Sequence, residues 1–277
     1  MVQGDEGRMS REGLISVLMG IYNCEDTLAE AIESILTQTY GNWELILCDD
    51  ASTDGTLAVA QRYGEHYPDR IRVLQNDEHR FLAYSLNRCL EAANGEFAAR
   101  MDGDDLSEST RFEKQVAFLR EHPDVDLVGT AMQRFDDDGS LGAVDRREDM
   151  PDRFSLHRGV PFNHATVMMR KRALEALGGY TVLPRTERGQ DIDLWARFFK
   201  AGYRGANLPD ALYRVRENAA AYKRRTAHVR WITCKTKCYA YRLLSYPWYW
   251  YWKPLAELLK VLVPTRLIQW IRKQKGR

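Results

Sequence analysis

The stretch ISVLMGIYNCEDTLAEAIESIL, residues 15–36, joins a short apolar run to a longer amphipathic one. Residues 14–19 are apolar except for one serine, as in a strand that is buried on both faces. Thr27 and Glu30 form the pattern of a helix capping box, and the apolar residues around them recur with helical spacing. The stretch therefore predicts one strand followed by one helix.

The same order of strand and helix recurs further along the chain. Apolar runs predict strands over 44–48, 71–74, 97–101 and 125–131, and helical spacing predicts helices over 56–63, 82–93, 112–122 and 192–199. Alternating elements of this kind require a mostly parallel sheet with helices on both faces. The fold class is therefore α/β, with a Rossmann-like sheet.

Three polar clusters follow predicted strands, over residues 21–26, 49–54 and 102–105. Since the carboxyl ends of parallel strands meet at one edge of the sheet, these clusters are expected to line one crevice. The last cluster lies in MDGDD, residues 101–105, which holds three carboxylates. Like charges this close raise one another's pKa unless water or a cation stabilises them. A solvated turn and a site for Mg²⁺ or Mn²⁺ bridging a diphosphate both explain the cluster.

Several other classes of phosphate site lack their motifs. The chain has no G-x-G-x-x-G after the first strand and no G-x-x-x-x-G-K-[ST]. An aspartyl phosphatase would carry its acidic motif on the first strand, with Thr or Val at the position of Leu106. A nucleotidyltransferase would have a glycine- and arginine-rich loop where this chain has Gly-Ile-Tyr-Asn over 20–23. These classes are disfavoured.

Charge is divided unevenly along the 277 residues. The formal net charge is +1, but residues 221–277 contain fourteen Lys and Arg side chains and only Glu257 as an acid. The other residues therefore carry an excess of acidic groups. This division predicts a body that holds a cation and a tail that binds an anionic partner.

The amino terminus and the cysteines indicate the compartment. Residues 1–12 form a polar extension without the apolar core of a secretory signal. The five cysteines are odd in number and scattered, and Cys234-x-x-x-Cys238 has no second pair of metal ligands nearby. We therefore expect a cytoplasmic protein without a disulfide framework.

The tail, residues 221–277, combines aromatic and basic residues. The run YPWYWYW covers 246–252, and leucines and isoleucines at helical spacing follow it. Charged residues interrupt these helices, so the tail is a poor transmembrane span. It suits a helix pair at the headgroups of an anionic membrane, peripheral on the inner face of the cell membrane. Packing of the aromatics on the body of the chain, residues 13–220, is the alternative. Nucleic-acid binding is disfavoured, because the leucines would have no use on that surface.

Five motifs occur in order along the chain: ISVLMGIYN (15–23), AIESILTQTY (31–40), LCDDASTDG (47–55), ANGEF (93–97) and MDGDD (101–105). Together they resemble the family 2 glycosyltransferases of GT-A fold, over residues 13–215. Within that family, the motifs resemble the branch that builds bacterial exopolysaccharide, capsule or teichuronic-type polymers. The resemblance implies an inverting enzyme that moves a sugar from a nucleotide diphosphate sugar, UDP-linked, to a hydroxyl of a lipid-linked saccharide.

The resemblance also implies roles for the residues that bind the nucleotide. Tyr22 matches the position that stacks on the base, with Asn23 beside it. Asp50 matches the carboxylate that accepts a hydrogen bond from the uracil N3–H, with Asp49 as a helper. Asp102 matches the acid near the ribose. An ordinary turn at the end of a strand is the alternative for each.

A divalent cation is implied as well. Asp104 matches the family's residue that binds this cation, and Asp102 and His164 are further candidates. Asn163 precedes His164 in a polar loop that the family places against donor or acceptor, although a histidine at the edge of the core explains His164 equally. Asp105 has no assigned role.

Asp191 matches the family's catalytic base, which takes the proton of the acceptor hydroxyl. Its alternative is a plain helix N-cap. The family usually has Glu before this Asp, whereas Gln190 stands here, and a non-catalytic binding subunit is compatible with that change. Asp193 is expected to orient a neighbour. Relatives often have glycine near Phe81, so the donor sugar stays open.

Overall fold

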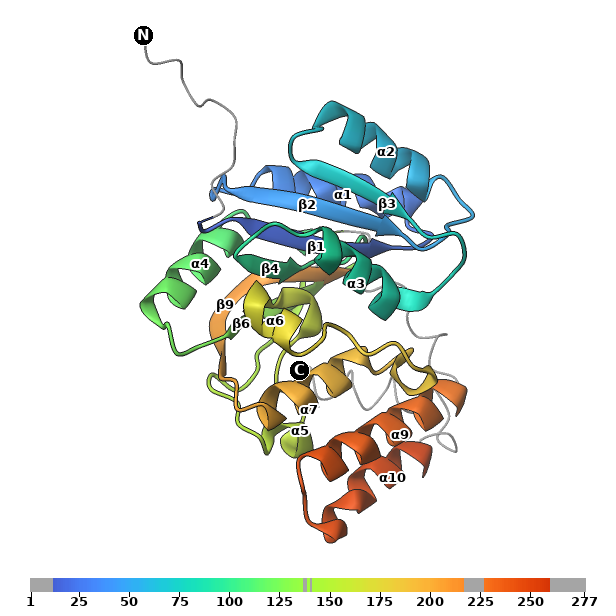
Figure 1. The fold of residues 1–277 in the computed structure, drawn as a ribbon, viewed down its shortest axis with the longest axis vertical. Coiled ribbons are helices and arrows are strands. Elements are labelled where there is room, and N and C mark those ends of the chain that lie inside the picture. Colours follow the sequence, from blue (N-terminus) through green and yellow to red (C-terminus); the bar gives the residue numbers. More distant parts are fainter. Residues whose placement is uncertain (1–11, 137–138, 140, 217–226, 260–277) are drawn as a thin grey trace.

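The computed structural model describes residues 12–136, 139, 141–216 and 227–259 (Figure 1). In these residues nine strands form one sheet with the order β3-β2-β1-β4-β8-β6-β9-β5, and β7 pairs with β6. The strands are β1 (Ile15–Ile21), β2 (Trp43–Asp49), β3 (Ile71–Gln75), β4 (Phe97–Arg100), β5 (Leu106–Ser107), β6 (Leu127–Phe135), β7 (Leu141–Asp145), β8 (Met168–Arg170) and β9 (Gly205–Arg216).

Helices cover both faces of the sheet. They are α1 (Glu25–Leu36), α2 (Thr56–His66), α3 (Phe81–Ala92), α4 (Arg111–Glu121), α5 (Ser155–Arg158), α6 (Lys171–Ala176), α7 (Gln190–Lys200), α9 (Ala227–Leu243) and α10 (Trp252–Leu259). Apolar residues of α1, α2 and α4 share one core with the sheet, and those of α3, α6, α7 and α9 share another. Helices on both faces are what the alternating sequence pattern predicted.

The amino-terminal half of the sheet is parallel. β1 pairs in parallel with β2 and β4, and β2 pairs in parallel with β3, so Val17 lies between Leu45 and Ala99. β1 and β2 are buried on both faces, which explains their continuous apolar runs. The predicted α/β fold class is confirmed, and the loops after β1, β2 and β4 meet at one edge.

The second half of the sheet is mixed, because β8 runs antiparallel to both β4 and β6. The long strand β9 was not predicted from the sequence. It contains Pro209 and Asp210, which disfavour strand structure, and its pairing with β6 shifts register near Thr130 and Ala131.

The predicted capping box is wrong. Helix α1 begins at Glu25, before Thr27, and no side chain caps it. The Thr27 hydroxyl instead donates to the backbone oxygen of Gly103, at 3.0 Å. Thr27 therefore joins α1 to the acidic loop at residues 101–105.

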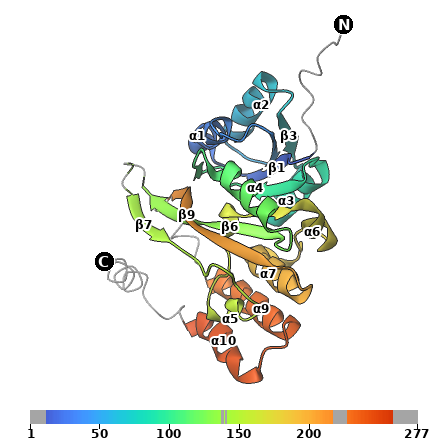
Figure 2. The ribbon, with the colours of Figure 1, turned by 90° about the vertical axis from the view of Figure 1, so that its left-hand side faces the viewer.

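The carboxyl-terminal helices lie at the opposite end of the molecule from α1 and α2 (Figures 1 and 2). Helix α9 packs on α7, and α10 packs on α9. Ala240, Tyr241 and Leu244 are buried in the same core as Trp195 of α7. Within the described residues, no helix is both long and apolar enough to cross a bilayer. The predicted apolar helix positions beyond Leu259 lie outside the described residues.

Candidate active site

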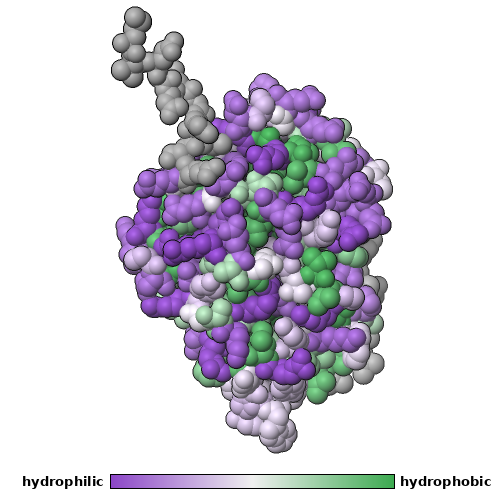
Figure 3. All heavy atoms as spheres, viewed as in Figure 1, coloured by the Kyte–Doolittle hydropathy of each residue, from purple (hydrophilic) through white to green (hydrophobic). Residues whose placement is uncertain are grey.

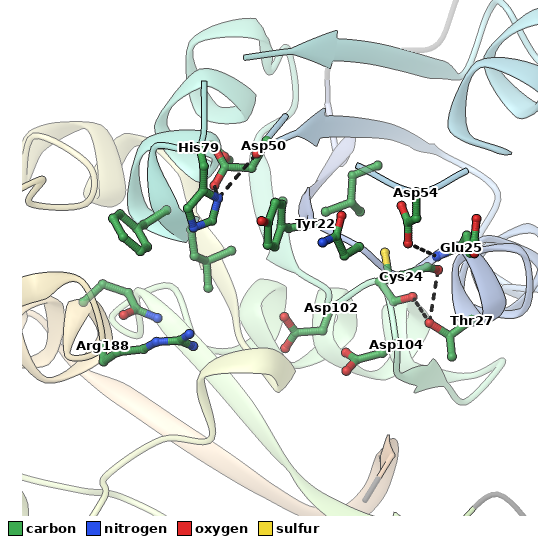
Figure 4. A pocket seen from close by; sticks show the side chains of 18 of the residues that line it. Tyr22, Cys24, Glu25, Thr27, Asp50, Asp54, His79, Asp102, Asp104 and Arg188 are labelled. Carbon is green, nitrogen blue, oxygen red and sulfur yellow. Dashed lines mark hydrogen bonds and ion pairs between the residues drawn. The ribbon is translucent and has the colours of Figure 1, made fainter. Parts of the chain in front are cut away.

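A cavity of about 690 Å³ opens where β1, β2 and β4 end (Figure 4). Its size is in the range of ligand pockets. Loops after these three strands and the first turn of α7 supply its walls. It brings together seven residues that the sequence pointed to, namely Tyr22, Asn23, Asp50, Asp102, Asp104, Gln190 and Asp191.

One wall of the cavity is aromatic. The Tyr22 ring lies 4.2 Å from the ring of His79, which lies 4.5 Å from that of Phe81. Phe81 has a φ of 65°, a left-handed conformation that a bulky residue rarely adopts and that is found most often at functional sites. His79 was missed in the sequence, although it lies in the loop after β3, at the same edge as the three polar clusters.

Asp50 lies behind this wall, only 3% exposed. Its Oδ2 is 2.9 Å from Nδ1 of His79, and its Oδ1 accepts hydrogen bonds from Asn76 Nδ2 at 2.7 Å and from the backbone N–H of Arg80 at 2.8 Å. These contacts hold the carboxylate rigidly at the cavity. An acceptor fixed beside an aromatic wall suits recognition of a ring that carries an N–H donor.

The acidic loop is anchored from several elements. The backbone N–H of Asp102 donates to the Tyr213 hydroxyl at 3.1 Å, and the Arg216 side chain donates to the backbone oxygen of Asp104 at 3.1 Å. A Cβ added at Gly103 would lie 3.0 Å from Ile21, so glycine lets the loop pass close to β1. The loop thus has a defined shape before any ligand binds.

The three carboxylates of this loop have different surroundings. Asp105 is buried and accepts a hydrogen bond from the backbone N–H of Arg216 at 2.9 Å. Burial, with the negative charges of Asp102 and Asp104, raises the pKa of Asp105 well above its usual range. Asp102 and Asp104 line the cavity, and Asp102 is paired with Nη2 of Arg100 at 2.5 Å. Asp105 therefore anchors the loop, and the other two face a ligand.

The donor set can be compared with the needs of a cation. Among the described residues, no three His, Cys, Asp or Glu side chains cluster as a closed metal site would require. Asp102 and Asp104 offer carboxylate oxygens at an open cavity, which suits Mg²⁺ or Mn²⁺ sharing its coordination with phosphate oxygens. Arg188, which the sequence analysis missed, also extends into this cavity (Figure 4).

His164 and Asn163 lie outside the lining of this cavity. Nε2 of His164 is 2.9 Å from the Tyr180 hydroxyl, and burial together with the Arg100 guanidinium holds the pKa of His164 well below its usual range. Oδ1 of Asn163 accepts from Nε of Arg147 at 2.6 Å. Both residues fix the chain beneath the site.

Asp49 and Asp193 are also absent from the lining. Asp49 is fully buried, and its Oδ2 accepts from the backbone N–H of Ser52 at 3.1 Å, which holds the loop that carries Asp50. Burial would raise the pKa of Asp193, but hydrogen bonds from Thr181, Arg197 and Arg185 outweigh it and lower that pKa. Asp193 therefore joins Thr181, Arg185 and Arg197 through its carboxylate.

Asp191 lies in the first turn of α7, at the boundary of the cavity. Burial raises its pKa above the usual value, while the backbone N–H groups of Ile192 and Asp191 and the charge of Lys237 offset part of this effect. Oε1 of the adjacent Gln190 is buried and has no hydrogen-bond partner within the described part of the chain. A carboxylate with a raised pKa beside an unsatisfied acceptor is suited to receive a hydroxyl group.

The model of a known family, Glycosyl transferase family 2, matches residues 16–178. The chain belongs to glycosyltransferase family 2. A second model, Glycosyl transferase family group 2, matches residues 99–272. The family assignment and the resemblance to the exopolysaccharide and teichuronic branch are therefore confirmed, and the chain is a glycosyltransferase.

Bacterial relatives share most of the length of this family member. EpsE of Bacillus subtilis is 56% identical over 76% of this chain and 76% of its own. The amylovoran biosynthesis glycosyltransferase AmsE of Erwinia amylovora is 32% identical over 83% and 85%. WfaP of Escherichia coli, a UDP-Glc:α-D-GlcNAc-diphosphoundecaprenol β-1,3-glucosyltransferase, is 27% identical over 73% and 77%.

Solved structures share the fold. TarS 1–349 of S. aureus in complex with UDP-GlcNAc has a TM-score of 0.66 at 19% identity, over 83% of this chain and 70% of that one. The mannosyltransferase PcManGT of Pyrobaculum calidifontis, in complex with GDP-Man and Mn²⁺, has a TM-score of 0.63 at 21% identity, over 90% and 72%. The GT-A fold of this family member is thereby confirmed.

Proposed function

We propose that this family member is an inverting glycosyltransferase of cell-surface polysaccharide biosynthesis. It moves a sugar from a UDP-linked donor to a hydroxyl of a lipid-linked saccharide. One observation carries the proposal: an aromatic wall with a fixed carboxylate, an acidic loop and a half-buried Asp191 surround a single cavity. These are the parts needed to hold a base, a diphosphate and an attacking hydroxyl together.

The nucleotide lies at the aromatic wall in this proposal. The base stacks on Tyr22 and His79, and the uracil N3–H donates to Asp50. WfaP, a relative named for the donor UDP-Glc, and the solved TarS complex with UDP-GlcNAc support UDP as the nucleotide.

The diphosphate lies over the acidic loop. Asp104, with Asp102, would hold Mg²⁺ or Mn²⁺, which supplies positive charge for the departing diphosphate when it is bound. The PcManGT complex with GDP-Man and Mn²⁺ supports this assignment. Arg188 contributes a further positive charge to the same space, so the leaving group meets cationic partners from two elements.

Transfer is a single displacement. Asp191 accepts the proton of the acceptor hydroxyl, whose oxygen forms a bond to the anomeric carbon as the bond from that carbon to the diphosphate oxygen breaks. Attack from the face opposite the leaving group inverts the configuration. Gln190, with its unsatisfied Oε1, accepts a hydrogen bond from a hydroxyl group of the substrate pair.

The acceptor is held at a membrane surface. WfaP acts on a saccharide linked to diphosphoundecaprenol, which supports a lipid-linked acceptor here. Trp248, Tyr249, Trp252 and Leu255 are 83%, 58%, 61% and 53% exposed, and they suit the headgroup region of the inner leaflet. Flotation with anionic vesicles should recover the wild-type protein and less of Trp248→Ala. Equal recovery with and without vesicles would contradict this part.

The donor proposal is tested by thermal unfolding with a panel of nucleotide sugars. We expect a UDP-sugar to raise the midpoint of unfolding in the presence of Mg²⁺ or Mn²⁺, and Asp104→Asn to remove the part that depends on the metal. Asp69→Asn, an exposed position outside the cavity, is the matched control. A shift that is identical in wild type and Asp104→Asn would refute the metal assignment.

A further inference from the structure

A second cavity, of about 380 Å³, adjoins the donor site. Asp191 lines both cavities, so the proposed base stands at their boundary. The walls of the second cavity come from α5, residues 159–161, α7, α9 and α10. Segments that are far apart in the sequence thus meet beside one reactive carboxylate.

Two lysines give this cavity a positive character. Lys237 of α9 and Lys253 of α10 both line it, and Nζ of Lys253 donates to the backbone oxygen of His157 at 2.9 Å. Burial lowers the pKa of His157, and the charges of Lys253 and Arg158 lower it further. Arg158 is itself paired with Glu148 and Asp152. Lys237, Lys253 and Arg158 are thus the cationic side chains in the lining of this cavity.

The cavity also holds a buried donor. Trp195 of α7 lines it, is fully buried, and has an indole N–H without a hydrogen-bond partner among the described residues. Buried donors are rarely left without a hydrogen-bond partner, because an unpartnered buried donor destabilises the fold. An oxygen-rich ligand would supply that partner.

The remaining lining is apolar and leads to an exposed aromatic rim. Ile192, Ala240 and Ala256 contribute apolar wall, and Trp252 extends from the lining to the surface, where it is 61% exposed. Figure 3 shows pale, weakly polar residues at the end of the molecule where α9 joins α10, which is where the run of Trp and Tyr lies. Positive charge, a buried N–H donor and apolar wall therefore all belong to the lining of the cavity that Asp191 bounds.

We propose that the second cavity is the acceptor site, in which Lys237 and Lys253 bind the phosphate groups of a lipid diphosphate whose saccharide reaches Asp191. This inference rests on the proposed function and adds the residues that select the acceptor. The lipid leaves the cavity over Trp252, so that only an acceptor anchored in the membrane fills all parts of the site. Helices α9 and α10 thus bind the lipid-linked acceptor as well as the membrane surface.

The test is binding of farnesyl diphosphate to the full chain, with UDP and Mg²⁺ at saturating concentration to occupy the donor cavity. Tryptophan fluorescence reports the dissociation constant. We expect wild type to bind, and Lys253→Ala to weaken binding about tenfold, as expected for a lost charged hydrogen bond. Farnesol, which lacks the diphosphate, should bind at least as weakly as the variant. Lys235→Ala, an exposed lysine of α9 outside the cavity, is the matched control and should bind as wild type does.

Each outcome decides the proposal. Unchanged affinity in both Lys253→Ala and Lys237→Ala would overturn it, and so would displacement of farnesyl diphosphate by UDP, which would place the probe in the donor cavity. If Lys235→Ala weakens binding of farnesyl diphosphate equally, the loss of any surface charge explains the result, and the proposal is overturned. The affinity for UDP is measured for every variant. It shows whether the variant is folded and has an intact donor site, independently of lipid binding. If the lysine variants bind farnesyl diphosphate as wild type does and still bind UDP, this inference fails and the proposed function stands.

Discussion

Replacing Asp191 with asparagine should slow transfer by about 10²–10⁴-fold and leave the fold unchanged. Asparagine has the same size and keeps an oxygen that accepts from the backbone N–H of Ile192. The lost interaction of a carboxylate with the start of α7 costs about 0.3–1 kcal/mol. Because burial penalises the charged form of Asp191, removal of the charge offsets part of that cost. The free energy of unfolding should therefore change by less than about 1 kcal/mol.

The effect on rate should be far larger. A positioned general base contributes roughly 10²–10⁴-fold, or about 3–5 kcal/mol of transition-state stabilisation. Tyr22 and Asp50, which are proposed to hold the nucleotide, line another part of the cavity, so the dissociation constant for UDP should not change. The variant thus separates binding from chemistry.

The pH dependence gives a second readout. Burial raises the pKa of Asp191, and only its ionised form can accept a proton. The wild-type rate should fall as pH decreases through this raised pKa, so the fall begins at a higher pH than it would for an ordinary aspartate. The asparagine variant should lose this acidic limb from its residual rate.

The assay is release of nucleoside diphosphate in the presence of acceptor lipid, together with UDP binding by calorimetry. Asp69→Asn provides the control for a lost surface charge. A rate for Asp191→Asn within a factor of three of wild type, with UDP binding intact, would refute its role as base.

Three further changes test the site and the fold. His79→Ala should raise the dissociation constant for UDP about tenfold in calorimetry, because it removes part of the stacking wall, whereas His66→Ala, outside the cavity, should not. Asp193→Asn should lower the free energy of unfolding, measured in urea, by about 3–5 kcal/mol, because Arg185 and Arg197 lose their buried partner. Its control is Asp210→Asn, which removes the exposed Lys114–Asp210 pair and should cost under about 1 kcal/mol. Gly95→Ala should cost about 1–3 kcal/mol, because its Cβ would lie 2.6 Å from the backbone oxygen of Leu14, and Gly41→Ala, with open space around it, should be tolerated. Equal effects within any of these pairs would contradict the corresponding contact.

The sequence predicted the parallel half of the sheet because its strands are buried on both faces. Continuous apolar runs such as 45–48 leave few alternatives. Strand β9 escaped prediction, since Pro209 and Asp210 interrupt its pattern and its pairing partners lie far away in the sequence. The capping box at Thr27 matched a local pattern, but a tertiary hydrogen bond to Gly103 uses that hydroxyl.

The candidate site divides in the same way. Acidic residues at strand ends could be found because topology alone brings those ends together. His79 and Arg188 lie in loops without periodicity, so their place in the cavity depends on the course of the backbone. The second cavity combines α5, α7, α9 and α10, and no local pattern indicates how such distant segments meet.

The most direct test of the central claim is the fate of a UDP-sugar incubated with the protein, Mg²⁺ and a lipid-linked saccharide. Proton NMR follows the anomeric signals of donor and product. The account predicts stoichiometric release of UDP and a product of opposite anomeric configuration, with both formed about 10²–10⁴-fold more slowly by Asp191→Asn. A bound donor that is never consumed, or a product that retains the configuration of the donor, would contradict it.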